Sequence, residues 1–219
     1  MHAWRAPGNQ RLTRALSGIK KESCHLKIKL KKLSYNAPVT LTFVLICFAA
    51  YLTDLIFGHG ARDKLFSVYG SPLSDPLTYI RLFTHVFGHA DADHLLGNML
   101  YILLLGPMLE EKHGKGAMIL LMAAAAFITG VFSALLFPNT RLLGASGIVF
   151  AMILMSSFTE FRKDTIPVTF ILVAVLYIGR EVINMFTAGG NIAYGAHILG
   201  GAVGGTLGYL LNVNERKTA

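Results

Sequence analysis

Long apolar segments are the feature that most constrains how this chain can fold. A helix needs about 20 mostly apolar residues to cross the roughly 30 Å hydrocarbon core of a bilayer. Six segments approach that length and composition, at 38–57, 94–109, 116–137, 142–159, 165–186 and 194–212. Only 15% of the residues are charged, which is too few to cover a soluble fold of this size. We therefore expect an all-α membrane protein built as a bundle of six transmembrane helices.

Basic residues are concentrated before the first apolar segment. Nine of the 20 lysines and arginines fall in the first 34 residues, in a stretch that ends KIKLKKL. They do not alternate with aromatic side chains on a folded face, so the net charge of +8 does not indicate nucleic-acid binding. The stretch also lacks the apolar segment and cleavage site of a signal peptide. We interpret it as a basic tail that lies near anionic lipid or is solvated.

The expected organisation follows from these segments. Residues 1–35 form the N-terminal tail, residues 36–212 the six-span domain, and residues 213–219 a short C-terminal tail. With six spans, both termini lie on one side of the membrane, and that side carries 15 lysines and arginines against five on the other. Because basic loops stay in the cytoplasm, both tails are predicted to be cytoplasmic.

Four polar side chains fall at a similar shallow depth in spans that run in the same direction. His94 and Asn98 are four residues apart near the start of the second span, so they share one helix face. Ser146 lies about 6 Å below the predicted start of the fourth span, and His197 lies one turn into the sixth. Alone, each residue has a structural interpretation, as a packing serine, an interfacial histidine or an interhelical amide. At one depth they are candidates for function.

The four residues suit acyl-transfer chemistry. A serine becomes a nucleophile when a positioned base accepts its proton, and histidine is the usual base, so Ser146 and His197 could form that pair. Asn98, His94 and the backbone N–H of Ser146 could stabilise an oxyanion. The fourth and sixth spans hold no Asp or Glu nearby, so such a hydrolase would use a dyad. This chemistry needs no cofactor and no metal.

Glycines offer a way to bring the two helices together. The GASG sequence lacks the second glycine of a G-x-S-x-G nucleophile elbow, because Ile148 stands there. The sixth span reads AHILGGAVGGTLG, in which Gly200 and Gly204 are four residues apart. Small residues at that spacing let two helix backbones approach closely, which would carry His197 toward Ser146. Dimerisation through the same glycines is the alternative, so the oligomeric state is left open.

Three motifs together resemble the rhomboid family of intramembrane serine proteases. They are RLFTHVFGHADADHLLGNMLYILLLGPMLEEKHG at 81–114, GASG at 144–147 and AHILGGAVG at 196–204. Their order and spacing are similar to the bacterial six-span form, and the likeness covers roughly residues 37–212. It implies that Ser146 is the nucleophile, that His197 is the general base and acid, and that His94 and Asn98 stabilise the oxyanion. It implies structural roles for Gly144, Gly147, Gly200, Gly204, Arg81 and Glu110, and for His85 and His89 in the outer loop.

Two positions depart from the family pattern. Many relatives carry Trp-Arg in the first loop, whereas this chain has Ile80 before Arg81. Some bacterial members have Tyr one turn beyond the serine, packed on the catalytic histidine, whereas this chain has Phe150. Phenylalanine keeps the aromatic face and loses the hydroxyl.

The resemblance implies a serine endopeptidase in a bacterial inner membrane that cleaves single-span membrane proteins near the outer face. One alternative is a non-catalytic rhomboid-like protein that binds transmembrane segments, although such relatives lack the serine, the histidine or both. A small channel or transporter is the other alternative. A transporter would be expected to show an internal repeat or ionisable groups at the midplane, and only Arg180 and Glu181 favour it.

Overall fold

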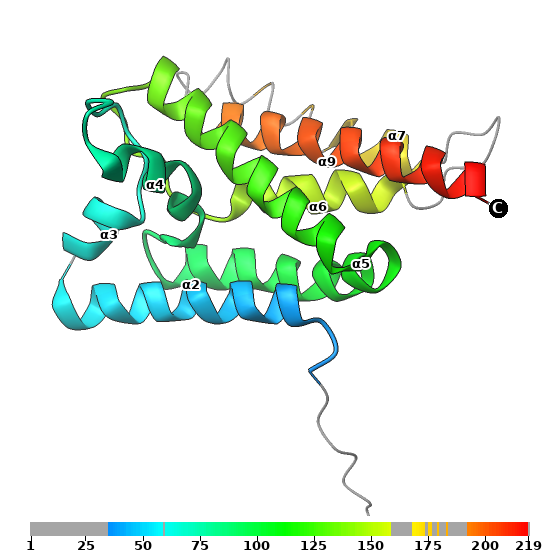
Figure 1. Cartoon of the computed structure of the whole chain (residues 1–219), viewed down its shortest axis with the longest axis horizontal. Coiled ribbons are helices and arrows are strands. Elements are labelled where there is room, and N and C mark those ends of the chain that lie inside the picture. Colours follow the sequence, from blue (N-terminus) through cyan, green and yellow to red (C-terminus); the bar gives the residue numbers. More distant parts are fainter. Residues whose placement is uncertain are drawn as a thin grey trace, which may run out of the picture. The chain divides into compact units, whose positions relative to one another are not determined.

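The computed structural model describes residues 35–58, 60–158 and 192–218, together with 168–173 and positions 175, 176, 179 and 183. Residues 1–34 of the predicted N-terminal tail and most of the predicted fifth span, including Arg180 and Glu181, lie outside the described residues. Every regular element of the described part is a helix (Figure 1). The elements are α2 (Pro38–Phe57), α3 (Gly60–Leu65), α4 (Pro76–Thr84), the 3-10 helix η1 (His85–Phe87), α5 (Ala92–Leu136), α6 (Ser146–Phe158), α7 (Val168–Val173) and α9 (Ile192–Thr218).

Two described helices, α2 and α5, are long and apolar enough to cross a membrane. Helix α5 contains 45 residues, but its backbone is broken at Gly114, where φ is +83°. Each half is about 33 Å long at 1.5 Å per residue, which matches the thickness of a bilayer core. One continuous element therefore contains the predicted second and third spans. The total of six spans stays a prediction, because the fifth lies mostly outside the described residues.

The break at Gly114 and the start of α2 lie at the same end of the bundle, which we call the kink end (Figure 1). Helix α2 has no side-chain cap of its own. The Glu110 carboxylate replaces it by accepting from the N–H of Val39 at 3.0 Å, the N–H of Thr40 at 2.9 Å and the Thr40 hydroxyl at 2.8 Å. A carboxylate at a helix N-terminus is favourable because it satisfies unpaired N–H groups and faces the positive end of the helix dipole.

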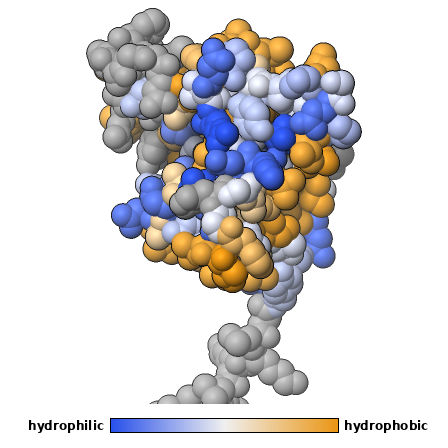
Figure 2. All heavy atoms as spheres, turned by 90° about the vertical axis from the view of Figure 1, so that its left-hand side faces the viewer, coloured by the Kyte–Doolittle hydropathy of each residue, from blue (hydrophilic) through white to orange (hydrophobic). Residues whose placement is uncertain are grey.

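The opposite end carries α3, α4 and η1, and we call it the loop end (Figure 1). Its centre is the buried side chain of Arg81, whose Nε donates to the Lys64 carbonyl at 2.8 Å. Its Nη1 pairs with the Asp75 carboxylate at 3.1 Å, and the guanidinium lies over the Tyr69 ring. Figure 2 shows hydrophilic residues gathered in the middle of this end, with hydrophobic residues around them. Arg81 thus ties the loop-end helices together.

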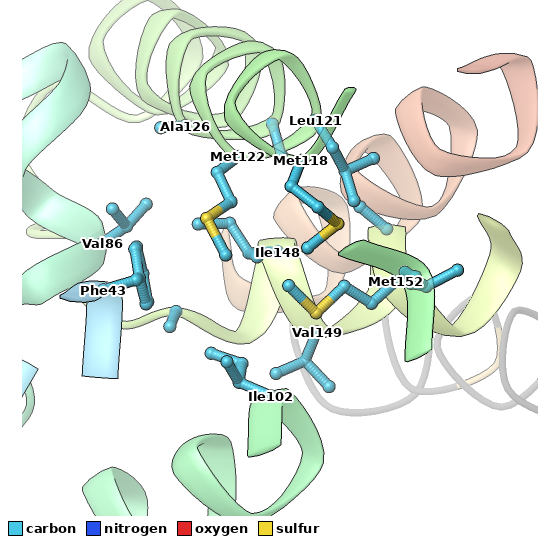
Figure 3. Close-up of a cluster of buried hydrophobic side chains, with 14 of the residues drawn as sticks. Phe43, Val86, Ile102, Met118, Leu121, Met122, Ala126, Ile148, Val149 and Met152 are labelled. Carbon is cyan, nitrogen blue, oxygen red and sulfur yellow. The ribbon is translucent and has the colours of Figure 1, made fainter. Parts of the chain in front are cut away.

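The core lies between the second half of α5 and helix α6. Met118 and Met122 of α5 belong to the same buried cluster as Ile148 and Met152 of α6 (Figure 3). Phe43 of α2 and Val86 of η1 extend the cluster toward α2. Methionine side chains are flexible, so they can fill irregular space between helices.

Helices α6 and α9 pack with almost no side chain between them. A Cβ atom on Gly200 would lie 2.1 Å from the Gly147 carbonyl oxygen, and one on Gly204 would lie 1.9 Å from the Ala151 carbonyl oxygen. Both are impossible contacts, so only glycine fits at either position. Each four-residue step along α9 matches a four-residue step along α6, so the two helices run in the same direction. In this packing the predicted glycines of the sixth span lie against the serine-bearing helix.

One predicted boundary is wrong. The fourth span was expected to begin at Leu142, but α6 begins at Ser146. Leu142 instead exchanges two backbone hydrogen bonds of 2.9 Å with Val68, and Gly144 has a φ of +119° that no helix accommodates. At the other terminus, α9 continues to Thr218, beyond the predicted end at residue 212.

The α6–α9 contact predicts different effects for substitutions at two adjacent glycines. Gly204→Ala should lower the stability by about 1–3 kcal/mol, because its methyl group would overlap the backbone of α6. Gly205→Ala is the matched control, since its Cβ would meet only Phe158 Cε2, at 3.4 Å. Thermal unfolding in mild detergent should therefore show a lower Tm for Gly204→Ala and little change for Gly205→Ala. Equal Tm values for the two variants would contradict the packing described.

Candidate active site

Ser146 is the first residue of α6, and the segment before it is held by backbone hydrogen bonds. Leu142 pairs with Val68, and the Gly144 N–H donates to the His85 carbonyl at 3.0 Å. We call residues 142–145 the serine loop. Because the first N–H groups of a helix have no intrahelical acceptor, the serine lies where donors and a positive dipole end are available. Its side chain is half-buried, so it is not sealed in the core.

His94 and Asn98 of α5 lie against the serine loop. A Cβ atom on Gly144 would be 2.8 Å from His94 Nε2 and 3.8 Å from Asn98 Nδ2. Gly144 therefore provides the space that both side chains occupy. Asn98 Nδ2 is buried and has no acceptor among the described residues. A buried donor without an acceptor is costly, so an amide in this position is available to bind an oxygen atom that arrives from outside.

His197 of α9 reaches the same level of the bundle. It lies three residues before Gly200, which touches Gly147 directly after the serine. Its ring stacks on Phe150 of α6, with the centroids 4.4 Å apart and the planes 8° from parallel. It also interacts electrostatically with His94. The structure therefore gathers Ser146, His197, His94 and Asn98, which the sequence placed at one depth, around the start of α6.

Phe150 stands at the position where the family resemblance predicts an aromatic side chain packed on the catalytic histidine. It lies one turn after Ser146, and its buried ring covers one face of the imidazole. Stacking fixes the plane of the imidazole without a hydrogen bond. The missing tyrosine hydroxyl thus leaves the stacking contact in place.

A buried histidine supports the serine loop from behind. His85 Nδ1 lies 3.1 Å from the Arg81 carbonyl, and its Nε2 lies 3.3 Å from the Thr129 hydroxyl. The Nδ1–H of the neutral imidazole donates to the Arg81 carbonyl. Its Nε2 contacts the Thr129 hydroxyl, which itself donates to the Ala125 carbonyl at 2.7 Å. Burial lowers the pKa of His85 to about 4, which keeps the ring neutral. The expectation of a locally bonded structural histidine fits this geometry, and the ring is buried rather than exposed.

Thr129 is the residue that the sequence analysis missed. It is buried in the second half of α5, and its methyl group lies 3.2 Å from the position of a Cβ on Gly147. It therefore contacts both His85 and the residue after the serine. In the sequence it stands out only as a hydroxyl in an otherwise apolar run. That signal is weak, because a threonine hydroxyl can donate to a carbonyl of its own helix.

His89 lies beside the site on the loop that precedes α5. Its ring meets the His94 ring edge-on with the centroids 5.1 Å apart, and its Nδ1 lies 3.2 Å from the Phe87 carbonyl. Burial, and then the nearby His94, lower the pKa of His89 to about 4. His89 thus holds one face of His94.

Two predicted structural residues are remote from this cluster. Arg81 organises the loop end, and Glu110 caps α2 at the kink end. No group of three or more His, Cys, Asp or Glu side chains that could hold a metal ion occurs among the described residues.

Comparison with known proteins identifies similar chains. The model of the Rhomboid domain family matches residues 76–214. Proteins named Rhomboid protease GlpG from Salmonella paratyphi A, Salmonella typhi and Salmonella newport are each 28% identical to this chain over 190 residues. Each match covers 82% of this chain and 65% of the relative, so the chain spans less than two thirds of those proteins.

The buried His85 predicts how stability depends on pH. Its pKa is about 4 in the folded protein, against an ordinary value of 6.5. As the pH falls, the unfolded chain therefore binds a proton at this histidine before the folded protein does. The contribution of the neutral ring to the free energy of unfolding is complete above pH 6.5 and is lost between pH 6.5 and pH 4. Unfolding in detergent between pH 4 and pH 8 should show this loss, of up to about 3 kcal/mol.

His85→Asn is the control, because it removes the titrating ring. The variant should be less stable at neutral pH and should lose less stability between pH 6.5 and pH 4 than the wild type does. Identical slopes for the two proteins would mean that His85 is not held neutral by burial.

Proposed function

The chain belongs to the rhomboid family, and on that premise we propose that it is an intramembrane serine endopeptidase. The observation that carries the proposal is the convergence of the serine loop, the stacked His197 and the unsatisfied amide of Asn98 at the start of α6. Three different helices contribute these groups. A packing role would explain the serine loop or the stacked histidine, but it would leave the buried Asn98 donor without an acceptor.

The proposed reaction is acyl transfer through a Ser146–His197 dyad. His197 accepts the proton from the Ser146 hydroxyl while Oγ attacks the carbonyl carbon of the scissile peptide bond. The same imidazole then gives that proton to the leaving amine, and the C–N bond breaks to form an acyl-enzyme. Water, deprotonated by His197, then attacks the ester carbonyl. The bond to Oγ breaks, His197 returns the proton to Oγ, and the carboxylic acid product leaves. The same histidine therefore acts as general base and then as general acid in both halves of the cycle.

The oxyanion of each tetrahedral intermediate would be bound by donors that are already in place. Asn98 Nδ2, the His94 ring and the backbone N–H of Ser146 are the proposed donors, and the positive end of the α6 dipole adds to them. Preorganised donors are effective because they need not reorient as charge develops. Phe150 takes over part of the orienting role that an acidic third residue has in a triad, by fixing the plane of the imidazole.

We propose that the substrates are single-span membrane proteins and that cleavage occurs near the outer face. The starts of α5, α6 and α9, which carry the proposed site residues, lie toward the loop end (Figure 1), where hydrophilic residues gather (Figure 2). Water could reach the acyl-enzyme from that side, while the apolar halves of α2 and α5 meet lipid. In this proposal the protein spans a bacterial inner membrane six times, with both termini in the cytoplasm.

The dyad is tested by cleavage of a model transmembrane substrate by purified protein. Ser146→Ala and His197→Ala should each lower the rate by at least about 10³-fold, because neither group acts without the other. Ser157→Ala is the matched control, since that serine belongs to the same helix and its hydroxyl donates to the Ile153 carbonyl at 2.9 Å. If Ser146→Ala still cleaved the substrate at the wild-type rate, the nucleophile would be another residue. If the folded wild type cleaved nothing, a binding function would replace the proposal.

Removal of one oxyanion donor should change kcat and leave KM nearly unchanged. Asn98→Ala should lower kcat by about 10²-fold or more with little change in KM, because the interaction exists only when charge develops on the oxygen. Asn98→Asp should be at least as severe, since a carboxylate would repel the oxyanion. A change confined to KM would assign Asn98 to substrate binding instead.

A further inference from the structure

An apolar groove runs along the bundle on the side of α2 and the second half of α5. It has a volume of about 520 Å³, and Ile46, Phe83 and Ile119, all exposed, border its opening. Figure 3 shows four of the side chains that form its inner wall, namely Phe43, Val86, Met122 and Ala126. The proposed active site uses none of these residues. The groove is large enough for a ligand of its own.

A polar cavity lies next to the groove at the kink end. This second cavity has a volume of about 460 Å³ and is lined by Asn36, Glu110, Glu111, Gly114 and other residues. The two spaces share Pro38 and Lys115, which line both. An apolar space and a polar space therefore follow one another along the same side of the bundle.

The dimensions fit one leaflet of a bilayer. The groove extends along α5 from Lys115 to Ala126, a distance of about 16 Å at 1.5 Å per residue. Half of the roughly 30 Å hydrocarbon core is about 15 Å. An acyl chain in the groove would therefore reach from the level of the polar cavity to the middle of the membrane, which is the arrangement of a glycerophospholipid.

The charges of the polar cavity identify the head group. The Glu110 carboxylate accepts from the N–H groups at the start of α2. Lys115 provides an exposed ammonium, which also interacts with the Glu110 carboxylate, and Glu111 provides an exposed carboxylate. A head group with a phosphate and a primary amine complements this pair, since the phosphate would meet Lys115 and the amine would donate to Glu111. A choline head group has no N–H to donate, and a glycerol head group has no positive charge for Glu111.

We propose that this groove and cavity bind one molecule of phosphatidylethanolamine, with an acyl chain in the groove and the head group between Glu111 and Lys115. The site joins α2 to α5, and its far end touches Phe83 and Phe87, which flank the His85 that supports the serine loop. Occupancy should therefore stabilise the bundle. The proposal concerns lipid binding and holds whether or not the protein is a protease.

The test is native mass spectrometry of the full-length protein in detergent, titrated with dioleoyl-phosphatidylethanolamine, -phosphatidylcholine and -phosphatidylglycerol. The wild type should bind the ethanolamine lipid about fivefold more tightly than the other two, since each well-placed charge contributes about that factor. Glu111→Gln should remove this preference, and Lys115→Gln should weaken binding of all three lipids. Lys64→Gln, at the loop end, is the control that should change nothing.

Filling the groove provides a second test. Ala123→Phe places a ring in the groove and should weaken binding of every phospholipid, whereas Leu120→Phe, at an exposed position that does not line the groove, should not. A Tm measured beside each titration shows that the variants are folded. Equal affinity of the wild type for all three lipids would overturn the proposal. So would a preference for phosphatidylglycerol, or an ethanolamine preference that survives in Glu111→Gln.

Discussion

The contact between the backbones of α6 and α9 is the constraint on which the rest of the site depends. At Gly200 and Gly204 the helices approach so closely that a methyl group would overlap a carbonyl oxygen. The approach fixes the register of α9 against α6, and the register sets His197 at the level of the serine loop. Phe150 can stack on the imidazole only in that register. In a bilayer, where apolar surface gains little from helix contact, close packing of small residues supplies the attraction.

The serine loop adds a second constraint, because it stops α6 from beginning where the apolar sequence begins. A positive φ at Gly144, a carbonyl of His85 and the bridge to Val68 hold the loop in a non-helical path. The result is a helix that starts inside the bundle, with its dipole and free N–H groups beside His94 and Asn98. An unsatisfied buried amide reduces stability locally, and such a cost is typical of functional sites. Arg81 and Glu110, at opposite ends, anchor the surrounding helices.

The apolar segments and the candidate site residues could be predicted from the sequence. Loops within apolar segments and contacts between distant residues could not. The bounds of α2 match the predicted segment 38–57, because a predominantly apolar run of that length, with Pro38 at its start and Gly58 after its end, favours one helix. The start of α6 was missed because hydropathy cannot distinguish a buried loop at Leu142 from a helix. Thr129 and the supporting role of His85 arise from contacts across 44 positions of sequence, which no local pattern encodes. The groove depends on the spacing between α2 and the second half of α5, and no local sequence pattern predicts that spacing.

The central claim is that His197 activates Ser146, and it is tested most directly by the rate of reaction with a fluorophosphonate, with the adduct located by peptide mass spectrometry. The account predicts a single adduct, on Ser146, and a labelling rate at least about 10²-fold lower in His197→Gln than in the wild type. A glutamine retains a polar side chain at that position but cannot accept the proton. Labelling of a different serine, or an unchanged rate at Ser146 without the imidazole, would contradict it.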